Sequence, residues 1–141
     1  MTKISRSIEM RVDPDTVWEF MDMRKWTQFS EIFKKIDLSS AEMKVGEIAT
    51  ITAGPGSEDV RYSAQITAFE PMKKLAYSRS GGPLPGKSEW QILANGTGSK
   101  VSFENTFRDP LPEPVEKSMA STMEKFLSDM KSAAEIAFGK P

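Results

Sequence analysis

The stretch that decides the fold is PEPVEKSMASTMEKFLSDMKSAAEIAF, residues 112–138, near the end of the 141-residue chain. Its apolar residues recur at steps of three and four, which places them on one stripe of a helix of about seven turns. These residues are Met119, Met123, Phe126, Met130, Ala133 and Ala137. Such a helix must lie on another apolar surface. An ordinary core face is one interpretation, and the methionines also suit a ligand-adaptable surface.

The preceding residues predict a sheet, because most segments alternate between apolar and polar side chains. An opening strand at 4–12 leads to two short helices, at 14–21 and 24–29. Further strands are expected at 32–39, 47–53, 60–69, 75–80, 88–93 and 100–107. Turn signals between them include Gly54-Pro55-Gly56, Glu70-Pro71-Met72-Lys73 and Asn95-Gly96, the last typical of a type I′ hairpin. This order predicts an α+β fold, in which a curved antiparallel sheet of about seven strands wraps around the C-terminal helix.

Composition excludes several functions. The 19 basic and 20 acidic residues leave a net charge of −1, which disfavours nucleic-acid binding. Cys and His are absent, which excludes disulfides, thiolate or imidazole catalysis and the common zinc sites. We therefore expect no metal and no cofactor. No stretch is long and apolar enough for a signal peptide or a membrane span, so we expect a cytoplasmic protein with no integral membrane association.

Three sequence motifs follow one another along the chain. They are Asp13-Pro14-Asp15-Thr16-Val17-Trp18, Phe69-Glu70-Pro71-Met72-Lys73-Lys74-Leu75-Ala76-Tyr77, and Glu89-Trp90-Gln91-Ile92 followed by Asn95-Gly96-Thr97-Gly98. The order and the motifs resemble the START-like (SRPBCC) helix-grip superfamily, which includes birch-pollen-allergen-like and polyketide cyclase/dehydrase-like proteins. The resemblance implies one ligand-binding domain over residues 1–141, with a hydrophobic cavity between sheet and helix. It implies no single chemistry, because members are carriers, sensors, cyclases and partner-binding modules.

Strand alternation identifies the side chains that would face this cavity. The inward sets are Tyr62, Ala64 and Ile66; Leu75, Tyr77 and Arg79; Ser88, Trp90 and Ile92; and Val101, Phe103, Asn105 and Phe107. A bulge would exchange the inward and outward sets. We expect Trp26 and Phe29 to close the mouth opposite the long helix. The predicted ligand-binding residues are Trp26, Phe29, Tyr62, Tyr77, Arg79, Trp90, Phe103, Asn105, Met123, Phe126 and Met130.

Each of these residues also has a purely structural interpretation. Trp90 and Phe103 suit an ordinary core, and the two tyrosines could point their hydroxyls to the rim. Arg79 is the sharper clue, because an inward guanidinium needs an anion or several acceptors to offset its desolvation. It lies close to the end of its strand, however, so solvent is the other candidate.

A motif at Gly81-Gly82-Pro83-Leu84-Pro85-Gly86-Lys87-Ser88 matches the pattern of a phosphate-binding loop. Such a loop needs successive backbone N–H groups and a following helix. Pro83 and Pro85 have no N–H, and the next residues are strand-like. We therefore predict a hairpin loop, placed where it could cover the mouth of a pocket.

Our leading hypothesis is a carrier or sensor that binds a hydrophobic or aromatic small molecule, lipids included. The alternative is a polyketide cyclase/dehydratase-type enzyme, in which Arg79 stabilises enolate charge. A second alternative is a protein-interaction module like the superfamily's cochaperone-like members. The sequence leaves a homodimer or a protein partner open.

Overall fold

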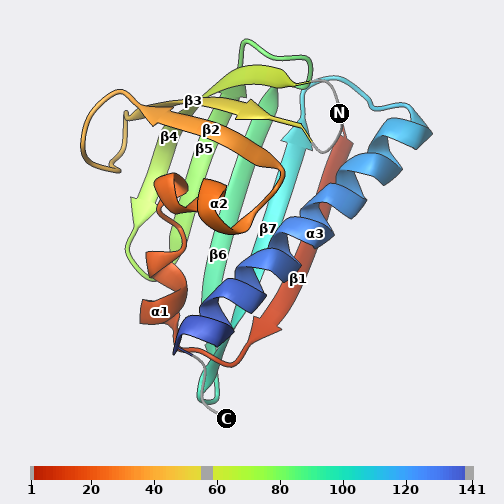
Figure 1. Cartoon of the computed structure of the whole chain (residues 1–141). Helices are drawn as coiled ribbons and strands as arrows, with labels where there is room; N and C mark the ends of the chain where they lie inside the picture. Colours follow the sequence, from red (N-terminus) through yellow and green to blue (C-terminus); the bar gives the residue numbers. More distant parts are fainter. Residues whose placement is uncertain (1, 55–58, 139–141) are drawn as a thin grey trace.

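The computed structural model describes residues 2–54 and 59–138. Its elements are β1 (Thr2–Met10), α1 (Pro14–Glu19), α2 (Met23–Phe29), β2 (Phe33–Leu38), β3 (Ile48–Ala53), β4 (Val60–Glu70), β5 (Lys74–Ser80), β6 (Gly86–Asn95), β7 (Gly98–Phe107) and α3 (Glu113–Phe138). All seven strands form one antiparallel sheet in the order β1-β7-β6-β5-β4-β3-β2 (Figure 1).

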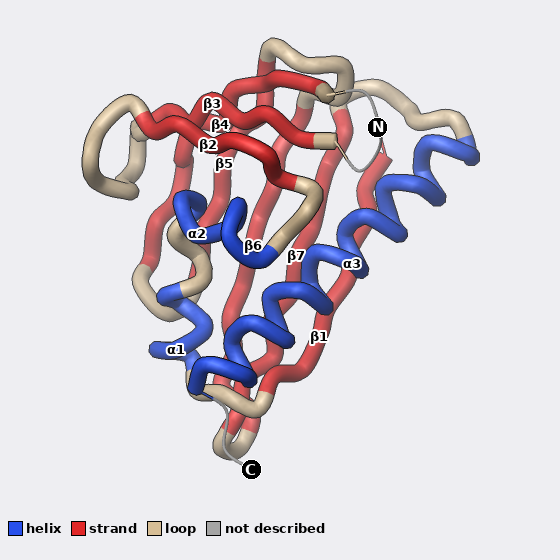
Figure 2. Tube along the Cα trace, viewed as in Figure 1, coloured by secondary structure: helices blue, strands red, loops and turns tan. Residues whose placement is uncertain are grey.

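The three helices lie on the same face of this sheet, and α3 runs past β1 and β7 (Figures 1 and 2). The sheet curves, so that β2 and β3 lie across from α3 on the far side of α2. Apolar side chains from the concave face and from the helices form one core. The predicted α+β helix-grip architecture, with two short helices after the first strand, is confirmed.

Local sequence signals account for the start of α1. The Asp13 side chain accepts a hydrogen bond of 2.9 Å from the amide of Thr16, and Pro14 occupies the first turn. Val12 and Val17 flank this cap and are both buried, as expected of a hydrophobic staple.

The buried stripe of α3 is broader than predicted and is rotated slightly. Met123, Phe126 and Met130 are buried as expected. Met119 and Ala133 are half-buried, and Ala120, Leu127 and Ala134 are buried beside them. The side chain of Ala137 lies outside the described part of the structure. The residue spacing defined a stripe, but its exact centre depends on how the helix crosses the sheet.

The predicted inward faces of the central strands are confirmed by burial, although β4 does contain a bulge. Register shifts between Ile66, which pairs with Tyr77, and Ala68, which pairs with Ala76. The bulge lies beyond Ile66, so the inward set of β4 is retained. Past it, Phe69 rather than Ala68 packs on the core.

The hairpin between β6 and β7 differs from the predicted type I′ turn. Its loop residues are Gly96 and Thr97, and φ is positive at Gly96 (63°) and not at Thr97. A type I′ turn needs positive φ at both positions. The predicted turn at Gly54-Pro55-Gly56 includes residues outside the described part of the chain.

Candidate ligand-binding site

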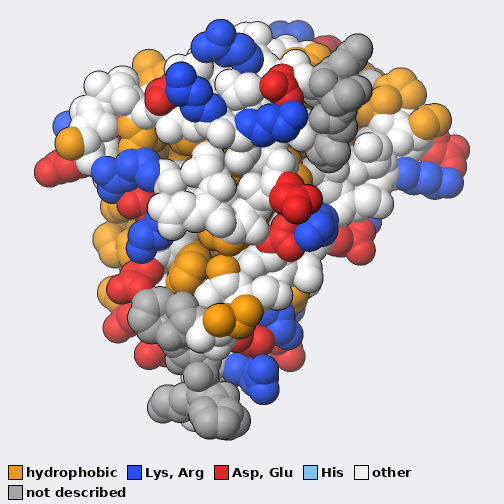
Figure 3. All heavy atoms as spheres, in the orientation of Figure 1, with side chains coloured by type: hydrophobic (Ala, Val, Ile, Leu, Met, Phe, Trp, Pro, Cys, Tyr) orange, Lys and Arg blue, Asp and Glu red, His pale blue; other side chains and the backbone are white. Residues whose placement is uncertain are grey.

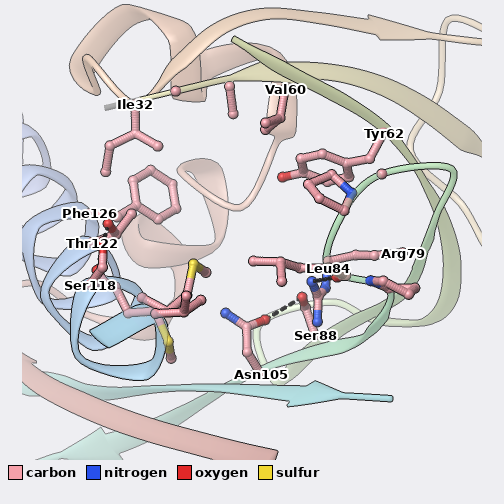
Figure 4. Close-up of a pocket in the computed structure, with 18 of the residues that line it drawn as sticks. Ile32, Val60, Tyr62, Arg79, Leu84, Ser88, Asn105, Ser118, Thr122 and Phe126 are labelled. Carbon is pink, nitrogen blue, oxygen red and sulfur yellow. Dashed lines mark hydrogen bonds between the residues drawn. The ribbon is translucent and has the colours of Figure 1, made fainter. Parts of the chain in front are cut away.

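A cavity of about 450 Å³ lies between α3, the concave face of the sheet and the loop that joins β5 to β6 (Figure 4). Its apolar lining comprises Ile32, Phe33, Ala53, Gly54, Val60, Gly82, Pro83, Leu84, Pro85, Phe103, Pro114, Val115, Met119, Met123 and Phe126. Its polar lining comprises Tyr62, Tyr77, Arg79, Ser80, Ser88, Asn105, Ser118 and Thr122. The described lining therefore contains one charged side chain, that of Arg79.

Seven of the predicted ligand-binding residues line this cavity: Tyr62, Tyr77, Arg79, Phe103, Asn105, Met123 and Phe126. They come from β4, β5, β7 and α3, which the fold brings together. Four others, Trp26, Phe29, Trp90 and Met130, do not line it. A role in ligand binding stays a prediction for every residue of the set.

Trp26 is in the core and not at the mouth, which corrects the expectation. It is fully buried, and its indole nitrogen donates a 2.8 Å hydrogen bond to the carbonyl of Phe20. Its ring lies 5.2 Å from that of Phe126 and 5.8 Å from that of Trp90, centroid to centroid. Phe29 stacks on Phe126 at 5.6 Å. Helix α2 thus supplies aromatic rings that pack behind Phe126 and support the wall of the cavity.

The β5–β6 loop contributes Gly82, Pro83, Leu84 and Pro85 to the cavity, so the false phosphate-binding motif lies beside the pocket. Gly82 packs closely on Tyr62, because a Cβ at this position would lie 2.8 Å from the Cβ of Tyr62. The sequence indicated that this loop could cover the mouth of a pocket. It did not indicate which residues the loop contacts.

Arg79 is oriented toward main-chain carbonyls. Its Nη1 donates to the oxygen of Leu84 at 2.6 Å, and its Nη2 donates to the oxygen of Thr106 at 2.9 Å. The guanidinium also lies over the ring of Phe107, 4.8 Å from its centroid. Burial lowers the pKa of Arg79, and its Nε is buried without a hydrogen-bond partner among the described residues.

Two hydrogen-bonded pairs of polar side chains lie along the wall formed by β5, β6 and β7. The indole nitrogen of Trp90 donates to the Tyr77 hydroxyl at 3.3 Å, and the Ser88 hydroxyl donates to Oδ1 of Asn105 at 2.5 Å. All four side chains are at most 5% exposed. Burial raises the pKa of Tyr77, so the phenol stays protonated at neutral pH.

Tyr62 lies on β4, and its hydroxyl points into the cavity (Figure 4). Burial raises the pKa of this phenol as well. Both tyrosines are therefore neutral hydrogen-bonding groups in the cavity.

Sequence reasoning missed the first turns of α3 as part of the lining. Val115, Ser118, Met119, Thr122 and Met123 are linked to one another by steps of three or four residues, so they lie on the same face of the helix. Met119 was assigned to the apolar stripe but not to the site. The helical spacing could have identified Val115, Ser118 and Thr122. They mix polar and apolar side chains, however, so they do not form an apolar stripe that the sequence pattern would show.

The face of the molecule shown in Figure 3 has no continuous patch of basic side chains among its described residues. On the face shown in Figure 3, acidic and basic side chains are intermixed. No helix of the described residues is long and apolar enough to cross a membrane. Within the same residues, no group of three or more carboxylates is placed to hold a metal ion.

Comparison with known proteins agrees with this fold. The family model described as polyketide cyclase/dehydrase and lipid transport matches residues 1–135. No curated protein sequence matches the chain. Similar solved structures include the protein TTHA0849 from Thermus thermophilus, with 14% identity, coverage of 98% of this chain and 100% of that chain, and a TM-score of 0.83.

Two other similar structures are of proteins from a bacterium and a plant. The Zhui aromatase/cyclase from Streptomyces sp. R1128 shares 13% identity, with coverage of 99% of each chain and a TM-score of 0.75. Ginseng major latex-like protein 151 from Panax ginseng shares 12% identity, with coverage of 94% of this chain and 97% of that chain and a TM-score of 0.79. At these identities the likeness establishes the fold alone. The family match, which spans nearly the whole chain, establishes that this protein belongs to the polyketide cyclase/dehydrase and lipid transport family of the SRPBCC superfamily.

Proposed function

We propose that this protein binds a hydrophobic or aromatic small molecule between α3 and the sheet, as a carrier or sensor. The observation that carries the proposal is the cavity of about 450 Å³, which has a mostly apolar lining and a few convergent polar groups. This volume and lining are typical of small-molecule sites. Burial of apolar ligand surface would supply affinity at about 25 cal/mol per Å². A cytoplasmic location and a protein partner stay predictions from the sequence.

The groups around the cavity favour binding over catalysis. A cyclase or dehydratase needs a side chain that accepts or donates a proton near neutral pH. The described lining has no carboxylate and no lysine, and burial raises the pKa of Tyr62 and of Tyr77. Arg79 already donates to two main-chain carbonyls. These features support a carrier or sensor as the first function to test.

The test uses the neutral fluorescent probe N-phenyl-1-naphthylamine and a variant that fills the cavity. Thr122 lines the cavity, whereas its neighbour Ser121 is exposed. We expect Thr122→Phe to weaken binding of the probe about tenfold or more, because the new ring occupies ligand volume. Ser121→Phe adds the same ring outside and should bind as the wild type does. Circular dichroism would verify that both variants fold.

Native mass spectrometry of protein purified from its own host would then identify a retained ligand. A stoichiometric hydrophobic compound that Thr122→Phe no longer carries would support the proposal. Equal probe binding by both variants, or a polypeptide in place of a small molecule, would contradict it. Turnover of the extracted compound would move the assignment to an enzyme.

A further inference from the structure

Asn105 carries a polar group that the fold itself does not use. The residue is 5% exposed and lines the cavity. Its Oδ1 accepts from Ser88, while no hydrogen bond from its Nδ2 is found within residues 2–54 and 59–138. The amide nitrogen points into the cavity (Figure 4). The nitrogen is not among the fully buried unpaired atoms of the described residues, so it is accessible from the cavity. A ligand that covers this N–H group without offering an acceptor would leave it unpaired at a cost in free energy, so the site favours a ligand that brings an acceptor.

The hydrogen bond from Ser88 determines which end of the Asn105 amide faces the cavity. The Ser88 hydroxyl donates to Oδ1, and an amide oxygen can only accept. The amide nitrogen, which can only donate, is the end turned toward the cavity (Figure 4).

The charges around the cavity narrow the chemistry of the acceptor. No carboxylate in the described lining could attract a cationic ligand, and Arg79 would repel one. Both Nη atoms of Arg79 are directed at the main-chain oxygens of Leu84 and Thr106, and its Nε is buried, so we expect no bidentate contact between the guanidinium and a ligand anion. Asn105 is itself uncharged. The described site therefore best matches a neutral acceptor.

We propose that the cavity selects a hydrophobic molecule with an uncharged acceptor oxygen, of the ketone or ester type, and that Nδ2 of Asn105 donates to this oxygen. The inference rests on the proposed function and names the class of ligand for the same site. Phe103, Met119 and Met123 line the cavity with Asn105 and would contact the apolar body of the ligand.

Three probes of nearly equal shape test the inference on the wild-type protein. They are 2-acetylnaphthalene, 2-isopropenylnaphthalene and 2-naphthoate, which present a ketone, the matching hydrocarbon and a carboxylate. Affinities are measured by displacement of N-phenyl-1-naphthylamine. We expect the ketone to bind about fivefold more tightly than the hydrocarbon, as one net hydrogen bond allows. The ketone should also bind more tightly than the carboxylate.

The Asn105→Leu variant isolates the donor. It removes the amide at similar size, so we expect the ketone to lose its advantage while the hydrocarbon binds as before. Asn95→Leu is the matched control, because it makes the same change at an exposed residue that does not line the cavity. Infrared spectroscopy of the bound ketone adds a direct measurement. The carbonyl stretch should lie at lower wavenumber in wild type and in Asn95→Leu than in Asn105→Leu.

The outcomes separate this inference from the proposed function. If ketone and hydrocarbon bind equally well to wild type, the cavity binds apolar molecules but the role of Asn105 is wrong. Tightest binding of the carboxylate would also overturn the inference and would assign an anion to Arg79. If none of the three displaces the fluorescent probe, or the probe itself does not bind, the proposed function fails. The affinities of the three probes for the wild-type protein, and the infrared spectrum of the ketone bound to it, test the inference even if Asn105→Leu does not fold.

Discussion

The guanidinium of Arg79 holds the main-chain oxygen of Leu84 at 2.6 Å, so a strand of the sheet fastens the loop that borders the cavity. A second bond of 2.9 Å links the same guanidinium to Thr106 in β7. One side chain thus connects β5, the β5–β6 loop and β7. The sequence suggested that the guanidinium of Arg79 could bind a ligand. In the structure, its hydrogen bonds position the wall of the cavity.

This relationship predicts that Arg79 controls access to the cavity. Arg79→Met keeps the apolar stem and removes both donors, so the loop around Leu84 loses its attachment. We expect the dissociation rate of N-phenyl-1-naphthylamine, measured by stopped-flow fluorescence, to rise several-fold. Arg61→Met is the matched control, since Arg61 is exposed on the neighbouring strand β4. Equal rates in wild type and Arg79→Met would contradict this role.

The carboxylate of Glu47 predicts an acid-sensitive contribution to stability. Glu47 is 3% exposed and accepts from the Ser39 hydroxyl and from the amide and hydroxyl of Ser40, the latter two at 2.8 Å. The bond from Ser39 is the main cause that lowers the pKa of Glu47 below its ordinary value of 4.5, against the opposing effect of desolvation. The folded state therefore binds fewer protons than the unfolded state.

The sign of the effect follows from this difference. The stabilisation by Glu47 is complete above the unfolded pKa, near 4.5, and is lost as the pH falls through the lower folded pKa. We expect Glu47→Gln to lower the melting temperature at neutral pH, with a gap to wild type that narrows below the unfolded pKa. Calorimetry from neutral pH to below the unfolded pKa measures this difference in melting temperature. Glu42→Gln is the control, because Glu42 is exposed. A gap that stays constant with pH would rule out the carboxylate as its source.

Trp26 should be a stability residue and not a ligand contact. Its ring packs among those of Phe33, Tyr77, Trp90 and Phe126. We expect Trp26→Ala to cost about 4 kcal/mol of unfolding free energy, as for other large buried side chains. Half-buried Trp18 is the comparison, and Trp18→Ala should cost less. Urea denaturation gives both values. If Trp26→Phe abolished probe binding at unchanged stability, Trp26 would instead belong to the site.

Gly86 is required where β6 begins beside Arg79. A Cβ at this position would lie 1.9 Å from the main-chain oxygen of Thr106 and 2.8 Å from Nη2 of Arg79. We expect Gly86→Ala to cost about 3 kcal/mol, because a strand must move to relieve the contact. Gly81→Ala meets open space but has φ of +79°, so about 1 kcal/mol is expected for that backbone conformation. Chemical denaturation ranks the two, and the reverse order would refute the steric explanation.

The sequence by itself determined the order of elements and the inward faces of the central strands. Strand and helix periodicities depend on local geometry, so the alternation around Tyr77, Trp90 and Phe103 is enough to place these side chains on the concave face. The Asp13 cap and the stripe through Met123 are likewise local signals. This explains why the fold was predicted almost completely and why seven predicted residues meet at the cavity.

Tertiary structure alone decided what those side chains contact. Whether Arg79 meets a ligand or the carbonyl of Leu84 depends on the path of a loop, which local alternation does not specify. Trp26 is buried because α2 packs its aromatic side against Phe126, a residue 100 positions later in the chain. The free N–H group of Asn105 also depends on Ser88 on the neighbouring strand. Contacts between distant segments follow from register and packing, and these exist only once the chain has folded.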